Sequence, residues 1–587
     1  MCGINGVFLT KENCRETIKA MNLITHHRGP DDQGIYLSEN NQLGLGLNRL
    51  AILGVKTGKQ PMISSNSRYV IVFNGEIFNY NELSYSFFQK KYSSDTKVLI
   101  ELFQKIGPKA LNHVNGMFAF AIYDKKEKKI ILARDRFGIK PLYYYHDRNK
   151  FIFSSEIKSI KLALNNHVQL DYQSISNYIT LNHTFGSSTV FKNIYSLEPG
   201  SFLIMNLSDF SIKKKQWYFP NIKKIILKTK NDYLLLAEEQ LKKSLKLWTT
   251  SDVPISFLVS GGLDSGLLSS IFNKMGEKTI NTFSLIFNNK NEKKWSEENE
   301  INKLTDELNS NHKFIIFNKT SFSKNIHKIV DDLDEPYAGG LPKWFLFREI
   351  SKKFKVAIIG DGGDELFGNY NRSFNLDDKE NKNKEIFVRN YFDKIYPTNL
   401  KWKKKYTNFY NIDDIADQYY KEFKKIKFGS YKKNISYLDL KTQLPNEFLY
   451  MNDLFSMRHS VEARTPYLDH ELVELIFSFP EDIRISKFEY KPILRKIAMK
   501  YLPESYLKKK KSGLSFPLSI YLRGELKNML NFYLSKKILD LHGIVKNSFY
   551  SDYVEPMLKG ENKYIQLIWN IFILHMWLSK KNKNFFS

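Results

Sequence analysis

Cysteine is nearly absent from this chain of 587 residues, which has only Cys2 and Cys14. So few cysteines exclude a disulfide framework and indicate a reducing compartment. A long apolar run is also missing. The longest, 565–578, contains Gln566 and falls short of the roughly 20 residues that cross a bilayer. No signal peptide precedes the first strand-like segment. We therefore expect a cytoplasmic protein without a membrane segment, in which 565–578 is a buried helix.

Acidic residues are too few to balance the basic ones. The chain has 89 Lys and Arg against 62 Asp and Glu, a formal charge of +27, which is a reason to consider nucleic acid as a partner. The lysines are interspersed with acidic and Asn residues, and no arginine-rich stripe with interleaved aromatics is present. We expect a solvated basic surface and no nucleic-acid partner. An apolar content of 42% over this length predicts two large domains, each with its own core.

A small-residue loop at 259–265, Val-Ser-Gly-Gly-Leu-Asp-Ser, lies between an apolar run and a helix-like segment. Backbone N–H groups at the start of a helix can hold phosphate, and the glycines allow close approach. Asp264 could hold magnesium on that phosphate. No Gly-Lys-Ser/Thr follows, so the pattern is not the Walker one. The alternative interpretation is an ordinary strand–turn–helix corner.

The pattern around this loop is an alternation of helices and strands, which predicts a parallel sheet with its site beyond the carboxyl ends of the strands. The predicted helices are 233–247, 297–309, 321–332 and 341–352, and the predicted strands are 253–258, 279–287, 313–317 and 355–359. The last strand ends in Gly360-Asp361-Gly362-Gly363-Asp364-Glu365. Acidic groups here and in the first loop suit magnesium bound to triphosphate, and a cluster of solvated turn acids is the alternative.

The first 208 residues have a different pattern, with many short strand-like runs and helical periodicity only at 15–24 and 96–106. This pattern predicts packed β-sheets with helices on their outer faces. The predicted strands are 4–9, 43–47, 69–73, 117–123, 129–133, 142–145, 151–153 and 201–207. A Lys-rich segment with little periodicity, 209–232, predicts a linker to the second domain, 233–587.

Cys2 is the candidate nucleophile of the first domain. Removal of Met1 is expected before a small residue and would leave a terminal thiol whose own amine, with a pKa of about 7.7–8.0, serves as the general base. The alternative is a small buried residue at a strand start. Asn74 and Gly75, at the end of a predicted strand, could form an oxyanion hole.

Charged residues near these positions suit an amino-acid substrate. Arg49 could bind a carboxylate, while Glu76 and Asp95 could hold an ammonium group.

Both halves contain strings that resemble the glutamine-dependent asparagine synthetases. In the first half these are Met1-Cys2-Gly3-Ile4, His27-Arg28-Gly29-Pro30-Asp31, Arg49-Leu50-Ala51-Ile52, Gln60-Pro61-Met62, 73–80, 94–96, 115–120, 134–141 and 155–158. In the second half they are the two loops, Ser456-Met457, 460–469, Lys491-Pro492-Ile493-Leu494-Arg495, Leu502-Pro503 and the basic run 508–511 before Ser512-Gly513-Leu514. Cys14 matches no string, and we expect it to be structural.

The resemblance implies the fold class. Residues 1–208 would form an α+β glutaminase domain, an αββα sandwich of the N-terminal-nucleophile hydrolase type. Residues 233–587 would form an α/β synthetase domain of the adenine nucleotide α-hydrolase type, with helical additions at its C-terminal end. A homodimer is what the family suggests.

The resemblance also implies roles for residues. Cys2 would attack the glutamine amide, Asn74 and Gly75 would hold the oxyanion, and glutamine would bind to Arg49, Asn74, Glu76 and Asp95. ATP would bind to Leu258, Ser260, Gly261, Gly262, Asp264, Ser265, Ser284, Gly360 and Asp361. Asp264 and Asp364 would bind Mg²⁺, Asp361 would lie near the reacting carboxylate, and Lys491 would stabilise the departing pyrophosphate.

The implied reaction is amide synthesis from L-aspartate, L-glutamine, ATP and water, through an acyl-adenylate and channelled ammonia. Three positions depart from the family pattern: a shortened segment at 337–341, Leu454 where a basic residue is usual, and Asn369 where glycine is usual. The first of these touches the acceptor pocket and leaves the acceptor open. The alternative acceptor is another acid, such as a sugar acid of a surface-polysaccharide pathway.

Two other classes of protein fit less well. A sulfur-transferring, tRNA-modifying pyrophosphatase generally needs cysteines near the synthetase domain, and none follows Cys14. An inactive scaffold is disfavoured because Cys2, Asp264, Asp364 and Lys491 are intact. The charged segment 374–434 has no predicted role.

Overall fold

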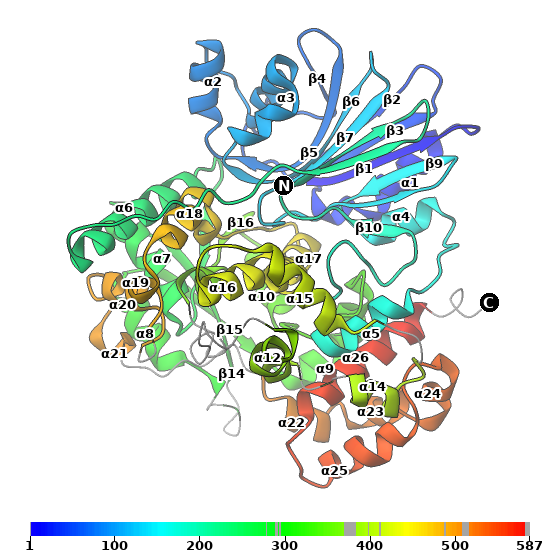
Figure 1. Ribbon diagram of the computed structural model, residues 1–587, viewed down its shortest axis with the longest axis vertical. Coiled ribbons are helices and arrows are strands. Elements are labelled where there is room, and N and C mark those ends of the chain that lie inside the picture. The colour runs from blue at the N-terminus through cyan, green and yellow to red at the C-terminus, as the bar shows by residue number, and fades with distance from the viewer. Residues whose placement is uncertain are drawn as a thin grey trace.

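The computed structural model describes residues 2–276, 279–287, 292, 295–368, 383–396, 398, 400–409, 413–486, 489–507 and 516–581. Figure 1 shows a β-rich first half in blue and cyan, packed against a larger second half in which helices predominate. Asn369, the basic run 508–511 with Ser512-Gly513-Leu514, and parts of 374–434 lie outside the described residues.

The first half contains two six-stranded antiparallel sheets. In sheet order, the first has β10 (Ile194–Ser196), β8 (Tyr143–His146), β9 (Lys150–Ser154), β1 (Cys2–Leu9), β3 (Leu43–Arg49) and β2 (Asp32–Leu37). The second has β12 (Ile212–Gln216), β11 (Ser201–Asn206), β7 (Lys129–Arg134), β6 (Gly116–Asp124), β5 (Tyr69–Ile77) and β4 (Met62–Ile63).

The two sheets pack face to face because their strands are apolar on both faces. On β5, Val70 and Val72 enter the core shared with β1, whereas Ile71 and Phe73 face the other way, as the two-residue period of a strand requires. Helices α2 (Tyr80–Phe88) and α3 (Asp95–Ile106) cover this second face. Helices α1 (Arg15–Ile24) and α4 (Ile157–Ala163) cover the outer face of the first sheet. The predicted αββα sandwich is confirmed.

The second half is built on a five-stranded sheet in which all the pairings are parallel. Its order is β15 (Asn311–Phe317), β14 (Asn281–Phe287), β13 (Ile255–Leu258), β16 (Val356–Ile358) and β17 (Glu462–Arg464). The predicted parallel sheet is confirmed, although β17 was not predicted. The strand has only three residues, two of them charged, and Glu462 and Arg464 are fully buried as an ion pair with each other.

Helices surround this sheet. The first is α6 (Lys230–Trp248), and Thr229 and Asp232 form a capping box at its N-terminus. It is followed by α7 (Leu263–Lys274), α8 (Glu298–Glu307), α9 (Lys319–Asp332), α10 (Lys343–Ile350) and α11 (Gly363–Phe367). Later helices include α12 (Lys384–Phe387), α14 (Leu400–Tyr406), α15 (Ile415–Lys425), α16 (Tyr431–Lys441), α17 (Tyr450–Arg458), α18 (His470–Ser478), α20 (Pro492–Ala498), α22 (Leu518–Arg523), α23 (Lys527–Tyr533) and α24 (Lys536–His542).

The C-terminal apolar run forms α26 (Ile565–Lys581), most of which is buried against α9 and the helices before it, as predicted. In the described part of the chain, no helix is both long and apolar enough to cross a membrane. Several elements lie where no regular element was predicted, among them β2, α2, α4 and β10. Helix α5 (Tyr172–Leu181) packs against α26 through the Tyr178 hydroxyl, which donates to the Asn570 carbonyl at 3.0 Å, and β12 lies within 209–232.

Candidate active sites

Cys2 opens β1 and lies opposite Arg49 in β3, with only 4% of its surface exposed. Its backbone N–H donates to Asn74 Oδ1 at 3.0 Å, so the contact joins the two sheets of the sandwich. Burial raises the pKa of the Cys2 thiol, and positive charges at the start of the chain and on Arg49 oppose this increase only in part. The thiol is therefore protonated at rest and needs a base to become a nucleophile.

Asn74 and Gly75 provide a spare donor and a close approach beside this thiol. Asn74 is fully buried, and its Nδ2 has no hydrogen-bond partner in the described part of the chain. A buried donor of this kind costs free energy unless a ligand satisfies it. Gly75 admits no side chain, since a Cβ there would lie 2.1 Å from the Met117 carbonyl oxygen. The strand therefore presents backbone and an unpaired amide at the predicted oxyanion position.

Arg49, Glu76 and Asp95 lie near these groups. The Arg49 guanidinium donates to the carbonyls of Leu53, Gly54 and Val55 at 2.8–3.2 Å, which fixes the loop after β3. Burial raises the pKa of Glu76 well above its usual range, and the charges of Glu462 and Asp95 add to the effect.

Asp95 accepts hydrogen bonds from the N–H groups of Ile77 and Thr96. Burial nevertheless raises the pKa of its carboxyl group, because these bonds offset only part of the desolvation. Two buried acidic groups close together favour a bound cation, such as the ammonium of an amino acid.

A second candidate site is a cavity of about 300 Å³ at the carboxyl ends of β13, β14 and β16. All of the predicted ATP and metal residues line it, together with Lys491: Leu258, Ser260, Gly261, Gly262, Asp264, Ser265, Ser284, Gly360, Asp361 and Asp364. The two loops are in contact, since a Cβ on Gly360 would lie 2.9 Å from the Ser265 nitrogen. The structure thus brings together residues from distant parts of the second half.

The loop after β13 already holds an anion. The N–H of Gly261 donates to Glu297 Oε2 at 2.8 Å, so a carboxylate lies where the loop directs its backbone donors. The N–H of Ser260 donates to Ser265 Oγ at 3.0 Å, and Tyr506 donates through its hydroxyl to the carbonyls of Ser260 and Gly262. These bonds hold the loop in an anion-binding conformation.

Lys491 joins the two acidic loops. Its Nζ lies 2.6 Å from Oδ1 of Asp264 and 2.6 Å from Oδ1 of Asp364, and only 2% of its side chain is exposed. Burial alone would lower the pKa of Lys491, but the two carboxylates outweigh it and raise the pKa. The lysine is charged at every physiological pH.

The same carboxylates suit a magnesium ion. Asp264 and Asp364 both contact a single cationic nitrogen, and Mg²⁺ bound to nucleotide takes one or two carboxylates while phosphates and water supply its other ligands. Among the described residues there is no group of three or more His, Cys, Asp or Glu that could hold a metal by itself. The donor set therefore fits a metal that arrives with a phosphate ligand.

Several residues of this cavity were not predicted from the sequence. Lys343, the first residue of α10, lines the cavity and has its Nζ 3.6 Å from Asp361 Oδ1. Trp295, Glu297, Tyr490, Arg495 and Tyr506 also line it. A basic residue directly after the shortened segment was a visible signal for Lys343, whereas nothing in the local sequence distinguishes Tyr506.

The shortened segment 337–341 does not itself line the cavity. The backbone of Ala338 bonds on one side to Asn182 and on the other to Trp569 of α26. Gly340 has a φ of +58° and lies so close to Met451 that a Cβ would meet its sulfur at 2.1 Å. The segment is a tight, buried turn that starts α10 at Lys343. Leu454 is 5% exposed and belongs to the apolar core.

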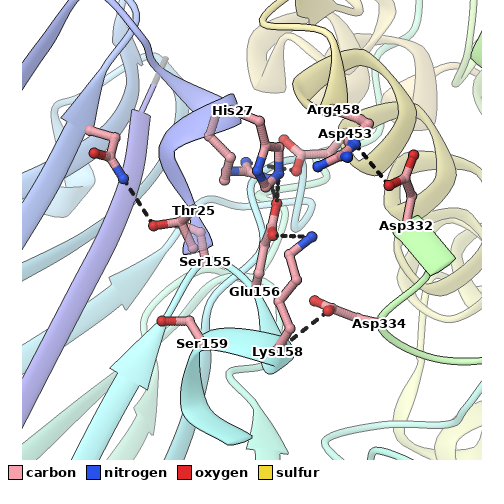
Figure 2. A network of polar contacts seen from close by, with 12 residues as sticks. Thr25, His27, Ser155, Glu156, Lys158, Ser159, Asp332, Asp334, Asp453 and Arg458 are labelled. Atoms are coloured by element: carbon pink, nitrogen blue, oxygen red, sulfur yellow. Dashed lines mark hydrogen bonds and ion pairs between the residues drawn. The ribbon is translucent and has the colours of Figure 1, made fainter. Parts of the chain in front are cut away.

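A buried cluster of ion pairs in the first half contacts the second half near Cys2. Figure 2 shows His27, Glu156 and Lys158 of the first half facing Asp334 and Asp453 of the second. Glu156 bonds to His27 at 2.9 Å, to Lys158 at 2.6 Å and to Arg28 at 3.1 Å. The backbone N–H groups of Ile157 and Lys158 donate to Asp334. These contacts make this part of the interface between the two halves polar.

Comparison with known proteins decides the family. The model described as a glutamine amidotransferase domain matches residues 1–218, and the model described as asparagine synthase matches residues 236–579. The chain belongs to the asparagine synthase family. The resemblance seen in the sequence motifs is confirmed, and the protein is an amidotransferase-coupled ligase of a family that uses ATP.

Individual relatives match between 63% and 99% of this chain. Glutamine-hydrolyzing asparagine synthetase 1 of Bacillus subtilis is 28% identical over 99% of this chain and 96% of its own length. A Methanocaldococcus jannaschii protein named among the same synthetases is 36% identical over 63% of this chain and 76% of its own length. Amidase chry2 of Gibberella zeae is 24% identical over 93% of both chains. The chain is thus similar both to proteins named asparagine synthetase and to one named amidase.

Proposed function

We propose that this protein makes L-asparagine from L-aspartate, with L-glutamine as the nitrogen donor and ATP as the activating substrate. The observation that carries the proposal is the buried contact of Cys2 with Asn74, whose amide keeps a free donor. A nucleophile beside an unsatisfied donor suits amide cleavage, and the family joins this activity to an ATP-dependent synthetase.

The glutaminase step uses Cys2 once Met1 has been removed. The α-amine takes the thiol proton, and the thiolate attacks the side-chain carbonyl carbon of glutamine. Asn74 Nδ2 and the Gly75 backbone donate to the resulting oxyanion, which collapses as ammonia leaves with the proton held by the amine. Water then hydrolyses the thioester, so glutamate is released and the thiol restored.

Glutamine is held in this site by charge. Arg49 binds its α-carboxylate, and Glu76 and Asp95 bind its α-ammonium. The raised pKa values of both buried carboxyl groups support this role, because a bound ammonium would offset the desolvation that raises them.

The synthetase step takes place in the 300 Å³ cavity. An oxygen of the acceptor carboxylate attacks the α-phosphorus of ATP, pyrophosphate leaves, and ammonia then displaces AMP from the acyl-adenylate. Backbone donors of 260–265 hold the pyrophosphate, and Lys491 balances the charge that develops on it. Leu258, Ser284 and Gly360 complete the nucleotide site, and Asp361 lies beside the reacting carboxylate.

Magnesium, bound by Asp264 and Asp364, would neutralise phosphate charge when ATP is present. Lys491 contacts both of these carboxylates, so it keeps the two loops at a fixed separation before the nucleotide arrives. The substrates are small molecules, and we place the reaction in the cytoplasm.

A second acceptor is favoured by one departure from the family pattern, the shortened segment 337–341. The alternative is therefore the same amidation of another carboxylic acid, such as a sugar acid. ATP-to-AMP turnover with a panel of acids separates the two, and turnover with other acids but none with aspartate would overturn the aspartate assignment.

Cys2→Ala tests the division of labour between the sites. We expect the variant to lose asparagine synthesis from glutamine and to keep synthesis from ammonium salts. Cys14→Ala is the matched control, because Cys14 is buried beneath α1 away from both sites, and it should retain both activities. Loss of both activities in a folded Cys2→Ala protein would contradict two separate sites. Mass spectrometry of the intact protein checks that Met1 is removed.

A further inference from the structure

Lys343 is a further cation in the synthetase cavity, and none of the steps of the proposed reaction uses it. It begins α10, and its side chain, 17% exposed, lines the cavity with Asp361 as its acidic neighbour. The distance from Lys343 Nζ to Asp361 Oδ1 is 3.6 Å, too long for a hydrogen bond. Lys491, in contrast, is clamped at 2.6 Å by two carboxylates. The charge of Lys343 is therefore the less compensated of the two.

Asn452 of α17 positions this lysine, although it is not itself among the residues that line the cavity. Its Oδ1 accepts a hydrogen bond from Lys343 Nζ at 2.9 Å, which fixes the ammonium against the helix. Asn452 is only 2% exposed, and its Nδ2 has no partner among the residues that the structure describes. An ammonium held in place in this way keeps other hydrogens that can bind an oxygen of a carboxylate.

Local sequence explains why the lysine reaches this place. The tight turn at Gly340 ends the shortened segment, and the N–H of Lys343 donates to the Gly340 carbonyl at 2.9 Å. Helix α10 therefore starts at Lys343, on the side of the cavity where Asp361 follows β16. Lys491 instead contacts Asp264, in the phosphate-binding loop, and Asp364. Lys343 and Lys491 thus occupy separate positions in the cavity, and the third cation that lines it, Arg495, pairs with Glu489 at 3.0 Å.

We propose that Lys343, positioned by Asn452, binds a second carboxylate of the acceptor, so that the acceptor is a small acid with two carboxylates. One carboxylate is activated beside Asp361, and the other pairs with Lys343. This inference rests on the proposed amide synthesis in this cavity and makes its acceptor more specific. L-aspartate meets the requirement through its α-carboxylate, whereas a sugar acid with a single carboxylate leaves the lysine uncompensated.

The test compares L-aspartate with its α-amide, which keeps the reacting carboxylate but lacks the second one. ATP-to-AMP turnover is measured with an ammonium salt as nitrogen donor, so that the glutaminase site is not involved. We expect the wild-type protein to prefer aspartate by about 100-fold in kcat/KM, the scale of charge-assisted hydrogen bonds. Lys343→Met should lose most of this preference, chiefly through a higher KM for aspartate.

Two further variants serve as comparisons for Lys343→Met. Lys343→Arg retains a cation and should keep part of the preference for aspartate. Lys352→Met is the matched control, because this lysine lies just after α10 with 61% of its side chain exposed, and it should behave as the wild type. Thermal unfolding shows whether each variant is folded.

Different outcomes separate this inference from the proposed function. If the wild-type protein uses aspartate and Lys343→Met loses the same factor in kcat/KM with aspartate and with its α-amide, the lysine acts on a group that both acids share. This result overturns the inference and leaves the proposed function standing. Lys343-dependent preference for another dicarboxylic acid, with no use of aspartate, supports the inference and overturns aspartate as the acceptor. Turnover with monocarboxylic acids only, or with no acid, overturns both.

Discussion

Arg28 and Asp453 form a buried ion pair of 2.8 Å between the two halves of the molecule. Their side chains are 1% and 4% exposed, and Asp453 lies among the polar contacts of Figure 2. Arg28 also donates from Nε to the carbonyl of Cys2 at 3.3 Å. A single guanidinium therefore links the backbone of the proposed nucleophile to α17, the helix that carries Asn452.

Removing one partner of this pair should destabilise the protein. Asp453→Asn leaves the Arg28 charge buried with less compensation, and we expect the free energy of unfolding to fall by about 3–5 kcal/mol. Urea denaturation followed by tryptophan fluorescence measures the change. Arg28→Met should cost at least as much, because it leaves both Asp453 and Glu156 without this partner.

The control for the ion pair is Lys243→Ala. Lys243 pairs with Glu239 at 2.8 Å on the surface of α6, where both side chains are more than 60% exposed. Solvent screens such pairs, so this change should cost less than about 0.5 kcal/mol. The double variant Arg28→Met/Asp453→Leu should be more stable than the sum of the single changes predicts. A cost for Asp453→Asn no larger than that of the control would show that the pair contributes nothing to stability.

Asn74→Ala tests the oxyanion assignment. Alanine removes the unpaired Nδ2 donor, and the loss of one oxyanion donor typically lowers kcat by about 10²–10³-fold. We therefore expect glutamine hydrolysis to fall by that factor, with little change in the KM for glutamine. Synthesis from ammonium salts should remain, because Asn74 lies in the first half and does not line the synthetase cavity.

Asn79→Ala is the matched control, since the Asn79 amide bonds the backbone of His113 and Asn115 near the end of the same strand. Glutaminase kcat in this variant should stay within about threefold of the wild-type value, because no donor to the oxyanion is removed. An equal fall in Asn74→Ala and Asn79→Ala would indicate local distortion of β5 and would contradict a specific role for the Asn74 amide.

Local sequence was sufficient for much of the fold. The apolar period of α1 gave its bounds, Arg15–Ile24, and the strands of both halves were predicted to within a few residues where they are apolar. Local sequence did not predict β17, because a strand of three residues with a buried Glu462–Arg464 pair has no apolar pattern. Burial of those charges is decided by partners distant in the sequence, such as the carbonyls of Trp248 and Thr250 that Arg464 bonds.

The residues of the candidate sites were likewise predicted only in part from the sequence. Residues in short motifs, such as Asp264 and Asp364, were identified because glycine-rich loops after apolar strands have a recognisable pattern. Lys343 and Glu297 were missed, since each is an ordinary charged residue at the start of a helix. Their importance depends on the tertiary packing that turns them toward the cavity.

Glu335 provides a pH-dependent prediction. Burial raises the pKa of its carboxyl group to about 8, and the charge of Asp334 adds to this while a hydrogen bond from the N–H of Val190 opposes it. In the unfolded chain a glutamic acid has a pKa of about 4.3. Between these two values the folded protein holds a proton that the unfolded chain has lost. The contribution of Glu335 to stability is therefore fully present below pH of about 4.3 and lost as the pH rises through about 8.

Glu335→Gln removes this titration and keeps an acceptor oxygen for the N–H of Val190. Relative to the wild-type protein, the variant should gain stability as the pH rises from about 5 to 8, by up to about 1.4 kcal/mol per pH unit. Urea denaturation of both proteins at several pH values across this range measures the difference directly, and the titration of all other groups cancels in it. A constant offset between the two curves would mean that Glu335 is ionised in the folded protein throughout, and that burial does not hold its proton.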